Sequence, residues 1–157
     1  MQFFSARQLY KTIIVQWRVE NYYFSVLKMS SPIERIKLSK KAKDQLMKLK
    51  RVTKIDQWNI LCRWAFCLSL AEKSNPAPYP IPADSNVEMS WHTFGGDMGD
   101  ILLLALKYRC YQDRLGTDEE TLNQQFRLHL HRGISYLAVN SDLQKLQNLL
   151  EMSKSAN

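Results

Sequence analysis

The sequence has few cysteines and no long apolar run, and each absence excludes a class of protein. Three cysteines are too few for a disulfide framework, and their odd number leaves one unpaired, so a reducing cytoplasm fits best. No apolar stretch approaches the roughly 20 residues that a membrane-spanning helix needs. The N-terminus also lacks the charged start, compact apolar stretch and small-residue cleavage site of a signal peptide. The sequence therefore predicts a cytoplasmic protein without a membrane partner.

Internal repeats and low-complexity blocks are missing too, and the 157 residues with 45% apolar content suffice for one domain core. The pattern changes abruptly at Met29, where "MSSPIERIKL" reads as the start of a domain. Two interpretations of the N-terminal extension, residues 1–28, stay open: a misassigned start codon, or a helix or strand pair that packs on the body. Residues 29–157 are predicted to form a single domain, with an extended proline-rich connection at 74–86.

A short alternating run precedes the first predicted helix. Ile36 and Leu38 point to one side, and Arg35, Lys37 and Ser39 point to the other, as in a half-buried strand. The Ser39 hydroxyl is suited to cap the helix that follows. In that helix one narrow inward stripe is expected to comprise Ala42, Leu46, Leu49 and Thr53.

The remaining segments read mainly as helices. Asp56 is the expected cap of a second helix, "QWNILCRWAFCLSLAEK", whose apolar character runs nearly all round. A third helix is expected near Met98 to Arg114, beyond "SWHTFGGD". Two further helices are predicted by the capping boxes Thr117-x-x-Glu120 and Ser141-x-x-Gln144.

The predicted fold class is mainly α. Its first part is a ribbon-helix-helix-like unit of one short strand plus two helices, and about three further helices follow. A lone strand leaves backbone groups unpaired, so we expect two protomers to pair their strands into a ribbon. Such ribbons enter the major groove of DNA, which Arg35, Lys37 and Ser39 would face.

Positive charge is concentrated in one stretch. The formal net charge is +7, and residues 37–54 alone hold eight basic side chains against the single acid Asp44. Solvated helix surfaces normally mix both signs, so this ratio favours a polyanionic partner over a plain soluble face. Lysines suit phosphates, which predicts salt-dependent binding that is mostly independent of sequence. The candidate DNA-binding residues are Arg35, Lys37, Lys40, Lys41, Lys43, Lys48, Lys50, Arg51 and Lys54.

Spacing argues against metal and cofactor sites. His129 and His131 are two residues apart, which on a helix turns them by about 200° to opposite sides. Cys62 and Cys67 diverge by about 140° on a helix. Buried thiols and hydrogen-bonded histidines are the expected roles. No cofactor and no metal are therefore expected.

Catalytic motifs are lacking as well. "FGGDMGD" has no Lys-Ser/Thr ending of a phosphate-binding P-loop, and acids at 118–120 suit the first turn of a helix. No nucleophile and base can be paired from spacing, so no catalytic residue is assigned. A nuclease using Asp97 and Asp100 with a divalent ion remains an alternative.

Several separated words of the sequence carry a resemblance to a known family. "IERIKLSKKAKDQLMKLK", "WNILCRWAFCLSLAE", "IPADSNVEMSW" with "TFGG", and "QFRLHLHRGISYLA" resemble the DndE family of bacterial DNA sulfur-modification proteins. The resemblance runs from about Ser30 to Leu150 and leaves residues 1–28 without a counterpart. Relatives commonly have glycine where this chain has Lys54; if the position needs a positive φ, lysine costs about 1 kcal/mol.

The resemblance implies a role in DNA phosphorothioation, in which sulfur replaces a non-bridging oxygen of the backbone. Members resemble small, non-enzymatic DNA-binding subunits of ribbon-helix-helix type, homotetrameric, with a preference for nicked duplex, that work beside other subunits. The expected function is therefore a DNA-binding subunit that grips duplex or nicked DNA. The alternatives are a protein-interaction scaffold of the modification complex and a ribbon-helix-helix transcriptional regulator.

Overall fold

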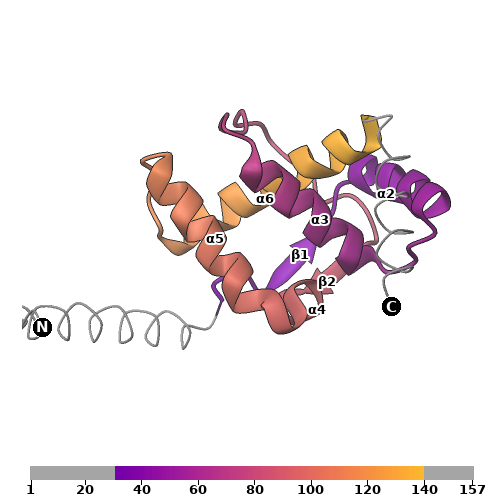
Figure 1. The fold of residues 1–157 in the computed structure, drawn as a ribbon, viewed down its shortest axis with the longest axis horizontal. Helices are drawn as coiled ribbons and strands as arrows, with labels where there is room; N and C mark the ends of the chain where they lie inside the picture. Colours follow the sequence, from indigo (N-terminus) through magenta and orange to yellow (C-terminus); the bar gives the residue numbers. More distant parts are fainter. Residues whose placement is uncertain (1–30, 140–157) are drawn as a thin grey trace, which may run out of the picture. The chain divides into compact units, whose positions relative to one another are not determined.

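The computed structural model describes residues 31–139, which build a helical body with a two-stranded sheet (Figure 1). In chain order the elements are β1 (Arg35–Lys37), α2 (Lys40–Thr53), α3 (Trp58–Ala71), β2 (Glu88–Ser90), α4 (Trp91–Gly95), the 3-10 helix η1 (Gly96–Met98), α5 (Gly99–Gln112) and α6 (Glu119–Val139). The predicted mainly α class, a short strand and two helices followed by further helices, is confirmed. Within the described range, no helix is both long and apolar enough to cross a bilayer.

The strand β1 finds its partner in the same chain. It pairs antiparallel with β2, and Ile36 lies opposite Met89. The ladder continues at both ends, since the Leu38 N–H donates to the Val87 carbonyl and the Trp91 N–H donates to the Glu34 carbonyl. The expectation of an unpaired strand that needs a second protomer was therefore wrong. The backbone groups on one edge of β1 are already bonded within the monomer.

The helix α2 forms as its sequence predicts. The Ser39 hydroxyl accepts a hydrogen bond from the Ala42 N–H at 3.2 Å, which confirms the predicted N-cap. The Asp84 carboxylate accepts a second bond from the Lys40 N–H at 2.7 Å. The buried residues of the helix are the four of the predicted stripe, Ala42, Leu46, Leu49 and Thr53.

Two predictions of helix caps were wrong. Asp56 does not cap α3, whose N-cap is Gln57 without a side-chain bond. Asp118, and not Thr117, accepts from the Thr121 N–H, because α6 begins at Glu119 and Asp118 is the residue directly before it. The segment before α5 forms the short helix α4, capped by Ser90, and the 3-10 helix η1. The predicted cap at Ser141 and the extension 1–28 lie outside the described residues.

The core lies where α3 crosses α6, the most extensive helix contact. A Cβ atom added at Gly133 would lie 1.8 Å from the carbonyl oxygen of Ala65, so only glycine permits this backbone approach. Phe66, Phe94 and Phe126 pack beside the crossing in tilted and edge-to-face contacts, with ring centroids 5.0–5.8 Å apart. Such aromatic clusters bury large apolar areas and hold the crossing rigid.

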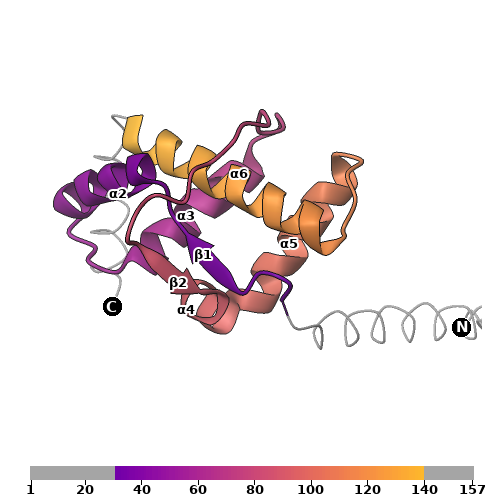
Figure 2. The ribbon, with the colours of Figure 1, turned by 180° about the vertical axis from the view of Figure 1, so that it is seen from behind.

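The described elements place α2 and α5 at opposite ends of this body. Both views show this separation, with α3 and α6 between the two ends (Figures 1 and 2). Figure 2 shows β1 and β2 side by side, with α2 leading away from one end of β1. The segment 75–84 has no helix or strand, as its prolines predict. The basic helix α2 therefore lies at one end of the helical body.

Candidate nucleic-acid interface

The basic residues of α2 cover its solvent-facing surface. Lys40, Lys41, Lys48, Arg51 and Lys54 are exposed, and Lys43 and Lys50 are partly buried. The apolar stripe fixes this orientation, because burying Leu46 and Leu49 turns the intervening positions outward. No acid lies in the first turn of the helix, and Lys50 and Arg51 lie in its last turn. We call the set Lys40, Lys41, Lys43, Lys48, Lys50, Arg51 and Lys54 the lysine surface.

Few groups of the protein neutralise the lysine surface. Within residues 31–139, no carboxylate forms an ion pair with any of its side chains. Lys43 donates to the Asn86 side-chain oxygen at 2.8 Å, and the Lys50 ammonium lies 4.8 Å from the centroid of the Trp58 ring. An excess of one charge sign destabilises a helix unless anions gather on it. The surface is therefore suited to a polyanion.

The prediction that Arg35, Lys37 and Ser39 all face outward is only partly correct. Arg35 is exposed but forms an ion pair with Glu88 at 3.2 Å across the sheet, a contact that is weak in water. Lys37 is partly buried, and its carbonyl accepts from Arg127 at 3.4 Å. Ser39 is buried as the cap of α2, so it does not face outward as predicted. Only Arg35 and Lys37 remain available on the strand.

The turn after α2 has the conformation that was expected to suit glycine. Lys54 is the C-cap of α2 with φ 60° and ψ 16°, and its N–H donates to the Lys50 carbonyl. A side chain in this left-handed region costs roughly 1 kcal/mol relative to glycine. Lys54 therefore has a charged side chain at a position where the backbone conformation favours glycine.

An open depression of about 750 Å³ lies at the end of the lysine surface. It is lined by Lys43, Met47, Lys50, Arg51, Lys54, Asp56 and Trp58. The sequence predicts Trp58 within a buried helix and does not predict its position beside the lysines. The available signal was its position at the start of α3, one short turn after the basic helix ends.

His129, His131, Cys62 and Cys110 are buried, whereas Cys67 is exposed, so the prediction of buried thiols was wrong for Cys67. The Ser39 N–H donates to Nε2 of His131 at 3.2 Å, so Nδ1 carries the proton and donates to the Arg127 carbonyl. His129 points the other way, with Nδ1 3.0 Å from the Ser69 hydroxyl, as the expected rotation requires. Burial lowers the pKa of His129 to about 4 and also lowers the pKa of His131. Both rings are therefore neutral near pH 7.

The described residues contain no group of three or more His, Cys, Asp or Glu side chains that could hold a metal ion. Burial raises the pKa of Cys62 to about 12 and, with the nearby Asp113 carboxylate, that of Cys110 to about 11. Thiols with such pKa values stay protonated and are weak nucleophiles. The candidate nuclease carboxylates are both exposed, Asp97 in η1 and Asp100 in the first turn of α5.

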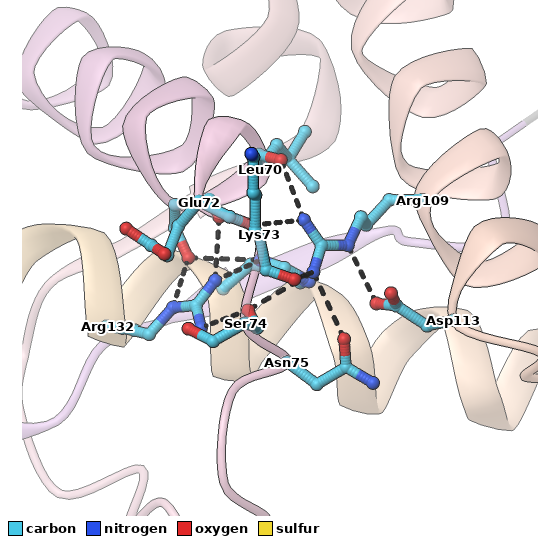
Figure 3. A network of polar contacts seen from close by, with 10 residues as sticks. Leu70, Glu72, Lys73, Ser74, Asn75, Arg109, Asp113 and Arg132 are labelled. Atoms are coloured by element: carbon cyan, nitrogen blue, oxygen red, sulfur yellow. Dashed lines mark hydrogen bonds and ion pairs between the residues drawn. The ribbon is translucent and has the colours of Figure 1, made fainter.

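Two arginines of α5 and α6 behave differently from the lysines of α2 (Figure 3). Arg109 is 7% exposed, pairs with Asp113 at 2.7 Å and donates to the carbonyls of Leu70, Glu72, Lys73 and Ser74 and to the Asn75 side chain. Arg132 donates to the hydroxyl and carbonyl of Ser69 and to the Ser74 carbonyl. These bonds occupy the carbonyls at the end of α3 and fix the start of the proline-rich segment.

Together these features define a mainly helical protein that presents a basic amphipathic helix beside a short two-stranded sheet. Residues 35–145 match the family described as DNA sulphur modification protein DndE, and the chain belongs to this family, which takes part in DNA phosphorothioation. The resemblance seen in the sequence is thereby confirmed. No curated protein matches the chain.

Solved structures agree with this family. DndE from Escherichia coli B7A, described as involved in DNA phosphorothioation modification, is 28% identical with a TM-score of 0.56, over 66% of this chain and 95% of that chain. A DndE mutant with two glycine-to-lysine substitutions, involved in DNA phosphorothioation, is 26% identical with a TM-score of 0.54, over 68% of this chain and 98% of that chain.

Proposed function

We propose that this protein is a non-enzymatic DNA-binding subunit of a cytoplasmic phosphorothioation system, and that its lysine surface grips duplex DNA, including duplex with a nick. The observation that carries the proposal is the lysine surface itself. Seven cationic side chains share one face of α2 and the turn after it, and within the described residues none of them forms an ion pair with a carboxylate. Phosphates of DNA supply the missing counter-charge.

The geometry favours phosphate contacts over base reading. Lysine ammonium groups are point charges that bind phosphate without a fixed orientation, whereas bidentate reading of guanine requires arginine. The strand contributes one exposed arginine, Arg35, which is already engaged with Glu88. Binding is therefore expected to depend strongly on salt and weakly on sequence.

Charge reversal on the lysine surface tests the proposal. The double variant Lys40→Glu and Lys48→Glu should weaken duplex binding roughly tenfold or more and reduce the slope of log K against log[salt] by about 2. Fluorescence anisotropy with intact and nicked duplexes at several salt concentrations measures both quantities. The control is Lys73→Glu with Arg114→Glu, which makes the same change in net charge at exposed residues outside the lysine surface. Equal losses in the two double variants would contradict the proposal.

A second candidate function, a protein-interaction scaffold, is favoured by α5. Ile101, Tyr108 and Tyr111 are 54%, 60% and 76% exposed, and they follow helical spacing on the end of the body opposite to α2. Exposed apolar patches commonly contact other proteins, here another subunit or copies of this chain in a tetramer. Light scattering of Ile101→Lys with Tyr111→Lys tests self-assembly, and competition between duplex DNA and the partner subunits separates the two functions.

The alternative function of a ribbon-helix-helix transcriptional regulator is not favoured. That alternative requires β1 to pair with the strand of a second protomer, and β1 already pairs with β2. The nuclease alternative likewise gains no support from Asp97 and Asp100, which no third metal-binding side chain joins within the described residues.

A further inference from the structure

The depression at the end of the lysine surface differs from the rest of that surface. Its lining includes four cations, Lys43, Lys50, Arg51 and Lys54, against the one carboxylate of Asp56. It also includes two large apolar side chains, Met47 and Trp58. Binding the outside of a duplex requires cations alone, so the apolar side chains call for another explanation.

Trp58 is anchored and yet accessible. It is the first residue of α3, is only partly buried, and packs against the hydrophobic core. The Lys50 ammonium lies 4.8 Å from its ring centroid, which places a cation over the ring face on the side of the lysine surface. Met47 is 48% exposed on the neighbouring helix α2. A rigid aromatic ring thus borders a concave, cationic surface.

Aromatic side chains within basic grooves are the feature that binds unpaired nucleotides. Each base presents a flat π face that stacks on tryptophan, and the flanking phosphates bind the lysines. A base inside an intact duplex is already stacked on its neighbours and cannot reach such a ring. Lys50 can leave the ring for a phosphate, because an ion pair attracts an ammonium more strongly than an aromatic face does.

We propose that Trp58 and Met47 form a stacking site for an unpaired base of DNA, and that Lys50, Arg51 and Lys54 hold the phosphates beside that base. The site rests on the proposed function, since it extends the lysine surface that grips duplex. It adds a preference for DNA in which a base is free to leave the stack. The ligand class is therefore single-stranded or gapped DNA next to duplex.

Affinity measurements on the full-length chain test the stacking site. The probes are an intact duplex, the same duplex with a short single-stranded thymine gap, and a thymine oligonucleotide. Trp58→Leu should bind the gapped duplex roughly tenfold more weakly, whereas Trp58→Phe, which keeps a stacking ring, should lose about threefold or less. Binding of intact duplex should be unchanged in both variants. The matched control is Trp64→Leu, six residues further along α3 and absent from the depression.

Tryptophan fluorescence supplies a second readout that does not depend on stability. Emission of the wild type and of Trp64→Phe should be quenched by the thymine oligonucleotide, and emission of Trp58→Phe should not. Equal weakening of intact and gapped duplex by Trp58→Leu, or quenching that survives in Trp58→Phe, would overturn the stacking site. Failure of the lysine surface would look different, because Lys40→Glu with Lys48→Glu would then leave intact duplex bound as in the wild type.

Discussion

Arg109 on α5 and Lys48 on α2 carry the same charge in opposite environments. Arg109 is 7% exposed and donates to five acceptors of the chain besides its ion pair with Asp113. Lys48 is exposed, and within the described residues its ammonium forms no ion pair. The buried arginine holds the fold together, whereas the exposed lysine is available to a ligand. Position in the fold, and not charge, separates structural from binding residues.

The largest effect that would test this comparison is expected from Arg109→Met. The variant leaves Asp113 and the carbonyls at the end of α3 without their donor, and breaking a buried pair in this way costs about 4 kcal/mol of unfolding free energy. Urea unfolding followed by circular dichroism measures the loss. Arg114→Met, at an exposed neighbour, is the control and should change stability by about 0.5 kcal/mol or less. A loss in Arg109→Met as small as in the control would mean that the buried arginine is dispensable.

The interior histidines predict the next largest effect, a loss of stability in acid. The pKa of His129 is about 4 in the folded protein and about 6.5 in the unfolded chain, so the unfolded state binds more protons between these values. Stability therefore falls as the pH drops below about 6.5, and His129 contributes a loss of about 2 kcal/mol between pH 7.5 and pH 5. Unfolding across this range should show a loss smaller by that amount in His129→Asn.

The exposed His92 provides the matched control. His92→Asn should keep the full acid-induced loss of the wild type, because this change leaves the buried His129 in place. If His129→Asn lost as much stability in acid as His92→Asn, the buried histidine would not be the origin of the pH dependence.

The α2 region could be predicted from its sequence, and the interior polar network could not. The stripe from Ala42 to Thr53 and the Ser39 cap follow from helical periodicity and local hydrogen bonding, which a sequence displays directly. Arg109 instead lies in a helix with apolar residues on all sides, and its acceptors are about 35 residues away in sequence. No local pattern marks such a contact.

Strand pairing and the aromatic side of the site were missed for related reasons. β2 has three residues, which are too few to show an alternating pattern. Its Met89 pairs with Ile36 of β1, which lies 53 residues earlier in the chain. Trp58 looked like one more apolar residue of α3, since only the turn after α2 brings it to the depression. Charge density located the lysine surface, but composition alone does not show which apolar side chain borders it.

Lys54 differs from the other exposed lysines, because its left-handed backbone conformation lowers the stability of the fold. Lys54→Gly should stabilise the protein by about 1 kcal/mol, since glycine adopts the φ of 60° without strain. The same change removes one cation of the depression and should reduce the salt slope of DNA binding by about 0.9. Thermal unfolding and anisotropy measure the two effects. Lys54→Ala is the control, because it removes the charge and retains the strain. Equal stability of the two variants would show that the turn is not strained.

The smallest effect on stability is expected from Lys41→Gln with Arg51→Gln. This double variant also separates loss of DNA binding from loss of stability most clearly. Both side chains are exposed on α2, and glutamine has a helix propensity close to theirs, so unfolding should change by about 0.5 kcal/mol or less. The salt slope of duplex binding should nevertheless fall by about 2, because two phosphate contacts are lost. Arg109→Met is expected to show the reverse pattern, a large loss of stability with an unchanged salt slope in the folded protein. A stability loss of several kcal/mol in the double variant would place these two cations with Arg109, as residues that hold the fold and do not bind DNA.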